Sequence, residues 1–317
     1  MTSLIIFSLL ALLLLTGMPI SIALGMTVLI FLFTLTRVPI EAVAMKLFTG
    51  IEKFEIMAIP FFILAGNFLT HGGVARRLIR FATAMVGHFH GGLGIASVMA
   101  CALFAAISGS SPATVAAIGT IMIPAMLKAG FPWQFGAGTV STAGALGILI
   151  PPSIVMVMYA VSTGTSVGVM FMAGIIPGIV LAFLLALTTW HEARKHDYPR
   201  QPCASGREIW DAFRQSIWGL LLIFLVLGGI YSGMFTPTEA AAVSAVYSFV
   251  VAVYIYRDLP IREVPRVLLA SANMSAMLLY IITNAMLFSF LLTHENIPQQ
   301  MAQWMLQQGL SAFSFLL

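Results

Sequence analysis

The chain has 317 residues, of which 60% are hydrophobic and only 8% are charged. Because soluble domains carry about 25% charged residues, this composition excludes a soluble globular protein and predicts an integral membrane protein. The formal net charge of +4 at pH 7 does not indicate nucleic-acid binding, because Lys and Arg gather between apolar segments, as the positive-inside bias of membrane proteins requires. The two cysteines, Cys101 and Cys203, predict neither a disulfide framework nor a metal site.

Apolar runs recur along the whole chain, starting at its first residues. They are about 15 to 25 residues long, the length at which a helix crosses a hydrocarbon core of about 30 Å. A transmembrane barrel would instead alternate apolar and polar residues in segments of about 10. We therefore predict an all-α, polytopic transmembrane helix bundle. The first run lacks a basic leader and a small-residue cleavage site, so we interpret it as retained and not as a signal peptide.

Residues 93–127 form a long apolar stretch that a polar, helix-breaking island interrupts at its middle. Arg76, Arg77 and Arg80 precede the stretch and Lys128 follows it, so the positive-inside bias places both of its ends in the cytoplasm. The stretch therefore predicts a re-entrant helical hairpin. Its tip supplies the first candidate ligands for sodium or substrate: Ser108, Gly109, Ser110, Ser111 and Thr114.

Residues 131–160 form the next apolar segment, which two consecutive prolines interrupt. Proline has no N–H group and disfavours a helical conformation in the residue before it, so carbonyl groups upstream lose their donors. The segment therefore predicts an unwound helix. Its candidate sodium or substrate ligands are Thr142, Gly144, Gly147, Pro151 and Pro152.

Unwound backbone inside a membrane is tolerated only where protein or a water-filled cavity satisfies it, and such breaks form the ion and substrate sites of secondary transporters. Freed carbonyl groups suit a sodium ion, and an exposed helix N-terminus suits a carboxylate. Two structural alternatives remain open at this point. The first island also fits helix packing through small residues, and the second fits a proline kink made for packing alone.

Beyond these segments, residues 191–214 form a basic loop that we place in the cytoplasm. Asn67 is more typical of a hydrogen bond between helices than of a substrate ligand. Glu239, which comes directly after the Thr236-Pro237-Thr238 run, is typical of an acid that caps a helix N-terminus.

An internal relation links two parts of the chain. Pro39 and Pro260 each open an amphipathic stretch that an apolar run follows. Counting membrane crossings from the basic loop places the first stretch outside and the second inside, which predicts an inverted repeat. Residues 1–190 would hold the first repeat, and residues 215–317 the start of the second. At this offset the counterpart of the Ser108 island would fall beyond Leu317, so we expect a truncated or incomplete carrier.

Enzyme signatures are missing from the sequence, which has no nucleophile triad pattern, no His-Glu-x-x-His motif and no phosphate-binding loop. We therefore expect that the chain is not an enzyme and that it does not hydrolyse ATP. Uphill transport would then draw on an ion gradient or on a partner protein.

Four motifs in chain order carry a specific resemblance: residues 60–67, 107–117, 147–153 and 236–240. Together they resemble the large membrane subunit of tripartite ATP-independent periplasmic (TRAP) transporters of the C4-dicarboxylate type, over essentially the whole chain. The family's first hairpin tip corresponds to residues 108–111 and its first unwound helix to residues 142–152. The run from Ser111 to Thr114 differs from that of the sialic-acid members, which favours a dicarboxylate.

The resemblance implies a sodium-coupled elevator carrier for organic acid anions in the bacterial inner membrane, with no cofactor beyond the coupling sodium ion. It also implies two partners, a small four-helix membrane subunit and a periplasmic substrate-binding protein. The family's second hairpin and second unwound helix are absent from this sequence. A non-transporting membrane scaffold, another sodium- or proton-coupled anion carrier and a passive channel remain alternatives.

Overall fold

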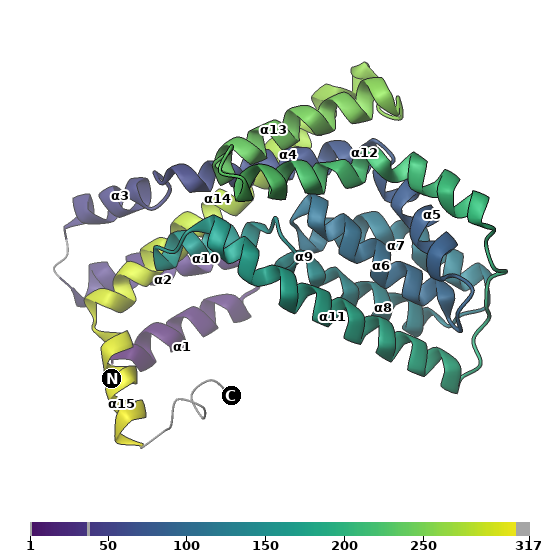
Figure 1. Cartoon of the computed structure of the whole chain (residues 1–317). Helices are drawn as coiled ribbons and strands as arrows, with labels where there is room; N and C mark the ends of the chain where they lie inside the picture. The colour runs from purple at the N-terminus through teal and green to yellow at the C-terminus, as the bar shows by residue number, and fades with distance from the viewer. Residues whose placement is uncertain (1, 37–38, 309–317) are drawn as a thin grey trace. The chain divides into compact units, whose positions relative to one another are not determined.

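The structure is a computed structural model that describes residues 2–36 and 39–308 (Figure 1). Every regular element in these ranges is a helix, which confirms the predicted all-α fold. Six of the described helical spans are long and apolar enough to cross a membrane, or seven if the bent pair Trp133–Leu149 and Ile154–Thr163 is one span. The chain is therefore a polytopic helical bundle.

The chain divides into two compact units, Met1–Lys53 with Ala276–Leu317 and Phe54–Ser275. The helices of the first unit, in its described part, are α1 (Thr2–Leu15), α2 (Ile20–Leu35), α3 (Ile40–Thr49), the second part of α14 (Val264–His294) and α15 (Ile297–Gln307). Phe31, Leu287 and Leu291 lie in its apolar core. Gly25 of α2 packs directly on the side chain of Asn284, where any larger residue would collide with the amide oxygen.

The second unit holds the remaining helices. They are α4 (Ala58–His71), α5 (Val74–Val86), α6 (Gly92–Ser108), α7 (Ser111–Lys128), α8 (Trp133–Gly144), α9 (Leu146–Leu149), α10 (Ile154–Thr163), α11 (Val167–Lys195), α12 (Gly206–Tyr231), α13 (Pro237–Val250) and the first part of α14, with short helical turns at Phe54–Met57, Val251–Ile255 and Ile261–Glu263.

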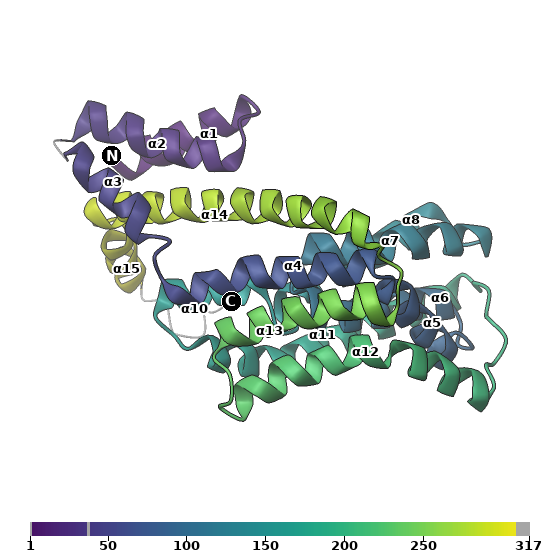
Figure 2. The same cartoon turned by 90° about the horizontal axis from the view of Figure 1, so that it is seen from above.

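Two groups of helices organise this second unit. Figure 2 shows α4, α13 and α12 side by side, and Phe68 of α4 meets Phe249 of α13 edge to face, with ring centroids 5.4 Å apart. In Figure 1, α5, α6, α7 and α8 lie together. The apolar face of α5 fits this arrangement, because Val74, Leu78 and Ala82 are all fully buried and recur at the helical period.

Capping interactions fix two helix starts. Thr236 and Glu239 form a reciprocal capping box at the start of α13, which confirms the capping role predicted for Glu239. Ser205 and Glu208 form the same box at the start of α12. The helices on either side of the predicted basic loop extend into it, because α11 continues to Lys195, and only residues 196–205 are left as the connection.

The two stretches compared as a repeat differ in continuity. The first is interrupted after α3, where Gly50 precedes a short segment that contains Glu52 and Lys53. The second runs from Val264 to His294 as one helix. Gly and charged residues weaken an apolar helix locally, and the second stretch has neither at the equivalent place. The orientation of the two stretches across a membrane stays a prediction.

One side of α11 is apolar and uncovered. Ile176 is 73% exposed and Phe183 is 65% exposed. Contiguous apolar surface of this kind marks a membrane or protein contact, and hydrocarbon is the environment that fits a helix with so little charge along its length.

Candidate functional site

The predicted hairpin tip is a break between α6 and α7. Helix α6 ends at Ser108, Gly109 adopts a left-handed conformation with φ of 61°, and Ser110 is extended before α7 begins. Glycine occupies the left-handed region without strain, and Pro112 lies in the first turn of α7, where its missing N–H group has no helical partner to lose. The sequence therefore stops one helix and starts the next within three residues.

Two buried hydroxyl groups form hydrogen bonds within this tip. Ser108 and Thr114 are 1% and 0% exposed, and their hydroxyl oxygens lie 3.1 Å apart in a hydrogen bond. The Thr114 hydroxyl also lies 2.8 Å from the carbonyl oxygen of Ser110, to which it can donate. Both side chains are thus engaged in the tip itself.

The ends of the two helices leave backbone groups without partners. At the end of α6, the carbonyl groups of Ile107 and Ser108 accept no hydrogen bond from the described residues. At the start of α7, the amide groups of Ser111 and Ala113 donate none within the same ranges. A helix C-terminus is partially negative and a helix N-terminus partially positive, so both kinds of end meet at this tip.

The second break follows α9 and confirms the predicted interruption at the prolines. Helical spans before and after it are bent by 41°, and the peptide bond between Pro151 and Pro152 is cis. The carbonyl groups of Gly147 and Ile148 would bond in a continuous helix to the residues four positions later, which are these two prolines. Neither carbonyl accepts a hydrogen bond from the described part of the chain.

The two breaks touch. The Ile154 amide donates to the carbonyl oxygen of Gly109 over 3.1 Å, which joins the start of α10 to the hairpin tip. A Cβ atom on Gly147 would lie 2.8 Å from the Ser111 nitrogen and 2.9 Å from the Ser110 carbonyl carbon. Only glycine allows α9 to approach the tip this closely. The structure thereby brings together most of the predicted residues from the two segments.

Gly144 and Thr142 lie differently. Gly144 packs mainly against Val115 of α7, and a Cβ atom on Gly144 would also lie 3.6 Å from the Ser111 carbonyl oxygen, so this residue borders the tip. Thr142 is exposed, and its hydroxyl donates to its own helix at the carbonyl oxygen of Gly138 over 2.8 Å. No hydrogen bond joins the Thr142 side chain to the tip.

Ser153 was not among the ligands predicted from the sequence. It is 0% exposed, stands at the cap position of α10 and makes no capping hydrogen bond. Its hydroxyl has no hydrogen-bond partner among the residues that the structure describes, although nearly all buried polar groups in proteins have one. The Ser153 Cα lies 3.5 Å from the position of a Cβ on Gly109. A serine directly after two prolines was the only sequence signal for it.

Helix α4 closes another side of the tip. A Cβ atom on Gly66 would lie 3.3 Å from Cα and Cβ of Ser108, so a small residue lets α4 pack against the end of α6. The next residue, Asn67, donates from its amide nitrogen to the Ser271 hydroxyl of α14 over 2.8 Å. This bond confirms the interpretation of Asn67 as a residue that links helices.

The site contains no titratable side chain. Neither break includes Asp, Glu, His, Cys, Lys, Arg or Tyr, and no group of three or more His, Cys, Asp and Glu side chains suited to a metal ion occurs among the described residues. What the site offers is backbone carbonyl groups, hydroxyl groups and helix ends. These groups can bind small ions and carboxylates, but the two breaks hold no acidic or basic side chain that would activate a hydroxyl for catalysis.

A helical membrane bundle in which two broken helices meet is the arrangement that forms ion and substrate sites in secondary transporters. A sequence model described as "Tripartite ATP-independent periplasmic transporter, DctM component" matches residues 7–317, and the chain belongs to this family. It is an integral protein of the inner membrane, and its family consists of transport proteins and not of enzymes.

Relatives with described roles agree with this membership. The chain is 67% identical to the C4-dicarboxylate TRAP transporter large permease protein DctM of Rhodobacter capsulatus, over 100% of this chain and 75% of the relative. It is 56% identical to the protein of the same name in Pseudomonas aeruginosa, over 88% of this chain and 65% of the relative. It is 34% identical to the sialic acid TRAP transporter large permease protein SiaM of Vibrio cholerae, over 93% of this chain and 69% of the relative.

Proposed function

We propose that this chain is the large membrane subunit of a sodium-coupled importer of C4-dicarboxylates. The observation that carries the proposal is the contact between two helix breaks, where the Ile154 amide bonds to Gly109 and backbone groups on both sides lack partners within the described ranges. Ile107, Ser108, Gly147 and Ser153 are buried. Leaving a buried polar group without a partner is unfavourable by about 1–3 kcal/mol, so a bound ion or anion is the simplest means of satisfying these groups.

Sodium fits the oxygen atoms of the two breaks. The carbonyl groups of Gly147 and Ile148 and the hydroxyl of Ser153 are uncharged oxygen ligands without partners among the described residues. Unwound backbone carbonyls and helix C-termini coordinate the coupling cation in transporters with broken helices. A proton would need a titratable group to hold it, and neither break has one. This favours sodium over a proton as the coupling ion.

A carboxylate fits the start of α7. The amides of Ser111 and Ala113 are without partners among the described residues, and the first turn of this helix has no acidic side chain to compete. Helix N-termini bind anionic groups through their free amides and the helix dipole. Two relatives named for C4-dicarboxylates are 67% and 56% identical to this chain, against 34% for a relative named for sialic acid. We therefore propose a dicarboxylate as the substrate.

The proposal includes two partners and a movement. A small four-helix membrane subunit would hold the permease, and a periplasmic binding protein would deliver the substrate. The hairpin and the broken helix, from α6 to α10, would cross the membrane together in an elevator-type movement against the rest of the assembly. Support comes from the direct contact of α7 with α8 and of α6 with α9, which lets these helices move without separating the two breaks.

The test is sodium dependence, measured in two ways on the permease assembled with its partner subunits. Uptake of radiolabelled succinate should require sodium, and sodium should raise the thermal midpoint of the purified protein, because a ligand that binds only the folded state stabilises it. Ser153→Ala should weaken apparent sodium affinity by about tenfold, since a hydrogen bond to a charged group contributes roughly 1.5–3 kcal/mol.

Ser248→Ala is the matched control. The Ser248 hydroxyl is also buried and has no partner in the described part of the chain, but it lies in α13, whose helix is continuous at that point. Its removal should leave sodium dependence unchanged. Equal sodium dependence in the wild type and in Ser153→Ala would refute the proposed ion site. Tight binding to partner subunits with neither uptake nor sodium stabilisation would indicate a scaffold subunit instead.

A further inference from the structure

A cavity of about 530 Å³ lies in the second unit, between the end of α4, the start of α5 and the middle of α7. Its lining includes Thr70, His71 and Arg76, Ala116 and Thr120 of α7, and Asp258. Cavities of a few hundred Å³ are the size that small-molecule sites have. This cavity does not coincide with the helix breaks.

The cavity lies close to the hairpin tip, because α4 and α7 border both of them. Helix α4 touches Ser108 at Gly66, and Thr70 follows Gly66 by one turn. On α7, Ala116 follows Ser111 by little more than one turn and Thr120 by one turn more. At a rise of about 1.5 Å per residue, the cavity begins roughly 6–8 Å from the tip and extends away from it. The tip and the cavity therefore share two walls.

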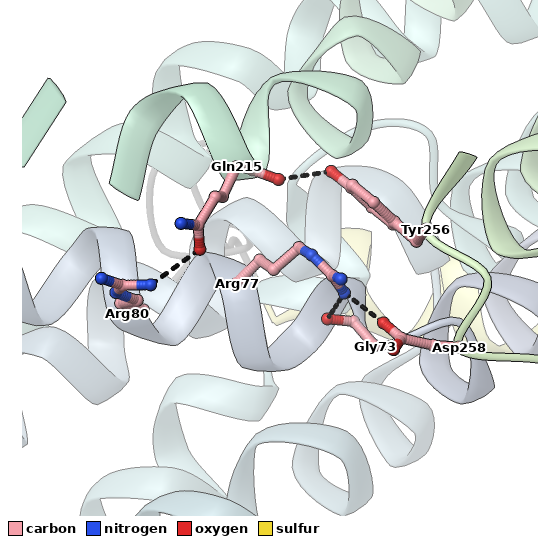
Figure 3. Close-up of polar contacts among 6 residues, drawn as sticks. All are labelled: Gly73, Arg77, Arg80, Gln215, Tyr256 and Asp258. Carbon is pink, nitrogen blue, oxygen red and sulfur yellow. Dashed lines mark hydrogen bonds and ion pairs between the residues drawn. The ribbon is translucent and has the colours of Figure 1, made fainter. Parts of the chain in front are cut away.

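The charges around the cavity leave one cation free. Figure 3 shows that Arg77 forms an ion pair with Asp258 and donates to the Gly73 carbonyl oxygen. Arg80 donates to the side-chain oxygen of Gln215 over 2.8 Å. Arg76 is exposed and has no hydrogen-bond or ion-pair partner in the part of the chain that the structure describes. Its charge is therefore available to a ligand.

Tyr256, which lies beside the Arg77–Asp258 ion pair, supplies no negative charge that would offset the charge of Arg76. Tyr256 stacks on the Arg77 guanidinium, whose carbon lies 3.8 Å from the ring centroid, and its hydroxyl donates to the carbonyl oxygen of Gln215 over 2.6 Å. Burial raises the pKa of Tyr256, so its phenol is neutral at physiological pH. Among the described residues that line the cavity, Asp258 is the one carboxylate, and Arg77 neutralises it.

We propose that this cavity is the cytoplasmic exit vestibule for an organic carboxylate, and that Arg76 is the residue that attracts the anion as it leaves the hairpin tip. The inference rests on the proposed function for the substrate class and on the positive-inside bias for the side of the membrane, because Arg76, Arg77 and Arg80 cluster here. A guanidinium group can bind a carboxylate through two parallel hydrogen bonds, while its exposure to water keeps the interaction weak enough for release.

The test uses a cysteine placed in the vestibule with Arg76 intact. Thr120→Cys is suitable because the Thr120 side chain is exposed and its hydroxyl bonds only within its own helix. Cys203 is exposed and is replaced by serine, whereas Cys101 is buried and stays. In inside-out vesicles, succinate should slow modification of the new cysteine by a negatively charged thiol reagent about two- to fivefold, the range of a water-exposed charge pair.

Two variants that each remove one arginine charge then test whether Arg76 is the residue that attracts the anion. Arg76→Gln in the Thr120→Cys background should abolish protection by succinate and lower the modification rate by the anionic reagent relative to a neutral one. Arg262→Gln, which removes another exposed arginine that has no hydrogen-bond or ion-pair partner among the described residues, should change neither quantity. Protection that survives Arg76→Gln would overturn the role of Arg76.

The remaining outcomes separate this inference from the proposed function. Sodium-dependent succinate uptake without protection of the new cysteine would refute the vestibule and leave the proposed function standing. Absence of sodium-dependent uptake in the parent protein would instead count against the proposed function. Inorganic phosphate is the comparison ligand, and protection by phosphate equal to that by succinate would indicate a site for phosphate groups, as in lipid headgroups, and overturn the assignment.

Discussion

Two polar regions lie within the apolar helices of the second unit, and they differ in how their polar groups are satisfied. Where α4 meets α14, Asn67 donates to Ser271, and the Ser271 hydroxyl donates to the Val267 carbonyl oxygen over 2.8 Å. Where the two helix breaks meet, the Ser153 hydroxyl and the Gly147 carbonyl have no partner among the described residues. Polarity alone therefore does not distinguish a binding site from a packing contact in this bundle.

The difference lies in the backbone. Helix α14 continues past Ser271 without interruption, so the side-chain bond there adds to a complete helix. At the breaks the helical bonds themselves are missing. Broken backbone in a membrane must be satisfied by protein, by water or by a ligand. A satisfied contact should respond to mutation through stability, and an unsatisfied one through ligand binding.

The largest expected effect comes from separating the two breaks. Gly147→Val would place a branched side chain against the Ser110 and Ser111 backbone, where even a Cβ atom is closer than 3.0 Å to the Ser111 nitrogen. Overpacking of this kind is unfavourable by about 1–3 kcal/mol and shifts backbone. We expect apparent sodium affinity in the uptake assay to fall by about tenfold or more, since 1.4 kcal/mol is a factor of ten.

Gly138→Val is the matched control for that substitution. Gly138 lies in α8, and a Cβ atom there would meet nothing within 4 Å, so sodium affinity should stay within about twofold of the parent value. Normal sodium dependence in Gly147→Val would show that close approach of α9 to the hairpin tip is not needed.

A smaller effect, of a different kind, is expected at the satisfied contact. Asn67→Ala removes the donor to Ser271, and hydrogen bonds between helices in membranes contribute about 0.6 kcal/mol on average. We expect a modest loss of stability with unchanged apparent sodium affinity. A double-mutant cycle with Ser271→Ala, measured as the free energy of unfolding in detergent, isolates the pair. A loss of sodium affinity without a loss of stability would move Asn67 into the binding site.

The two helix breaks could be predicted from the sequence where they depend on local backbone effects, but not where they depend on contacts between segments distant in the chain. Gly109 and the prolines at 151 and 152 act on their own backbone, so both breaks could be placed from sequence. The contact of Gly147 with Ser110 and the isolation of the Ser153 hydroxyl depend on helices that pack from elsewhere in the chain. A lone serine or glycine in an apolar segment carries no signal of such an approach.

Helix ends were less predictable than helix breaks. Helix α11 runs on to Lys195 within the segment predicted as a loop, because Arg and Lys have high helix propensity and suit the last turn of a helix. A charged residue marks the end of the hydrocarbon and not the end of the helix. The same reasoning explains why α14 can begin close to Arg262, in a stretch that the charge pattern assigns to the cytoplasm.

The smallest effect is expected at Thr142, the candidate ligand whose side chain has another partner. Its hydroxyl bonds to the Gly138 carbonyl oxygen within α8 and faces the exposed side of that helix. Thr142→Val keeps the shape of the side chain and removes only hydrogen bonds within α8, to the carbonyl oxygens of Gly138 and Thr139. Apparent sodium affinity should therefore change by less than about twofold, as for most exposed substitutions. Measured beside Ser153→Ala in the same uptake assay, it compares a bonded, exposed hydroxyl with a buried, unpartnered one. If Thr142→Val lowered sodium affinity as much as Ser153→Ala, the missing partner of Ser153 would not be what identifies a ligand. The ion would then have to bind along α8 as well as at the two breaks.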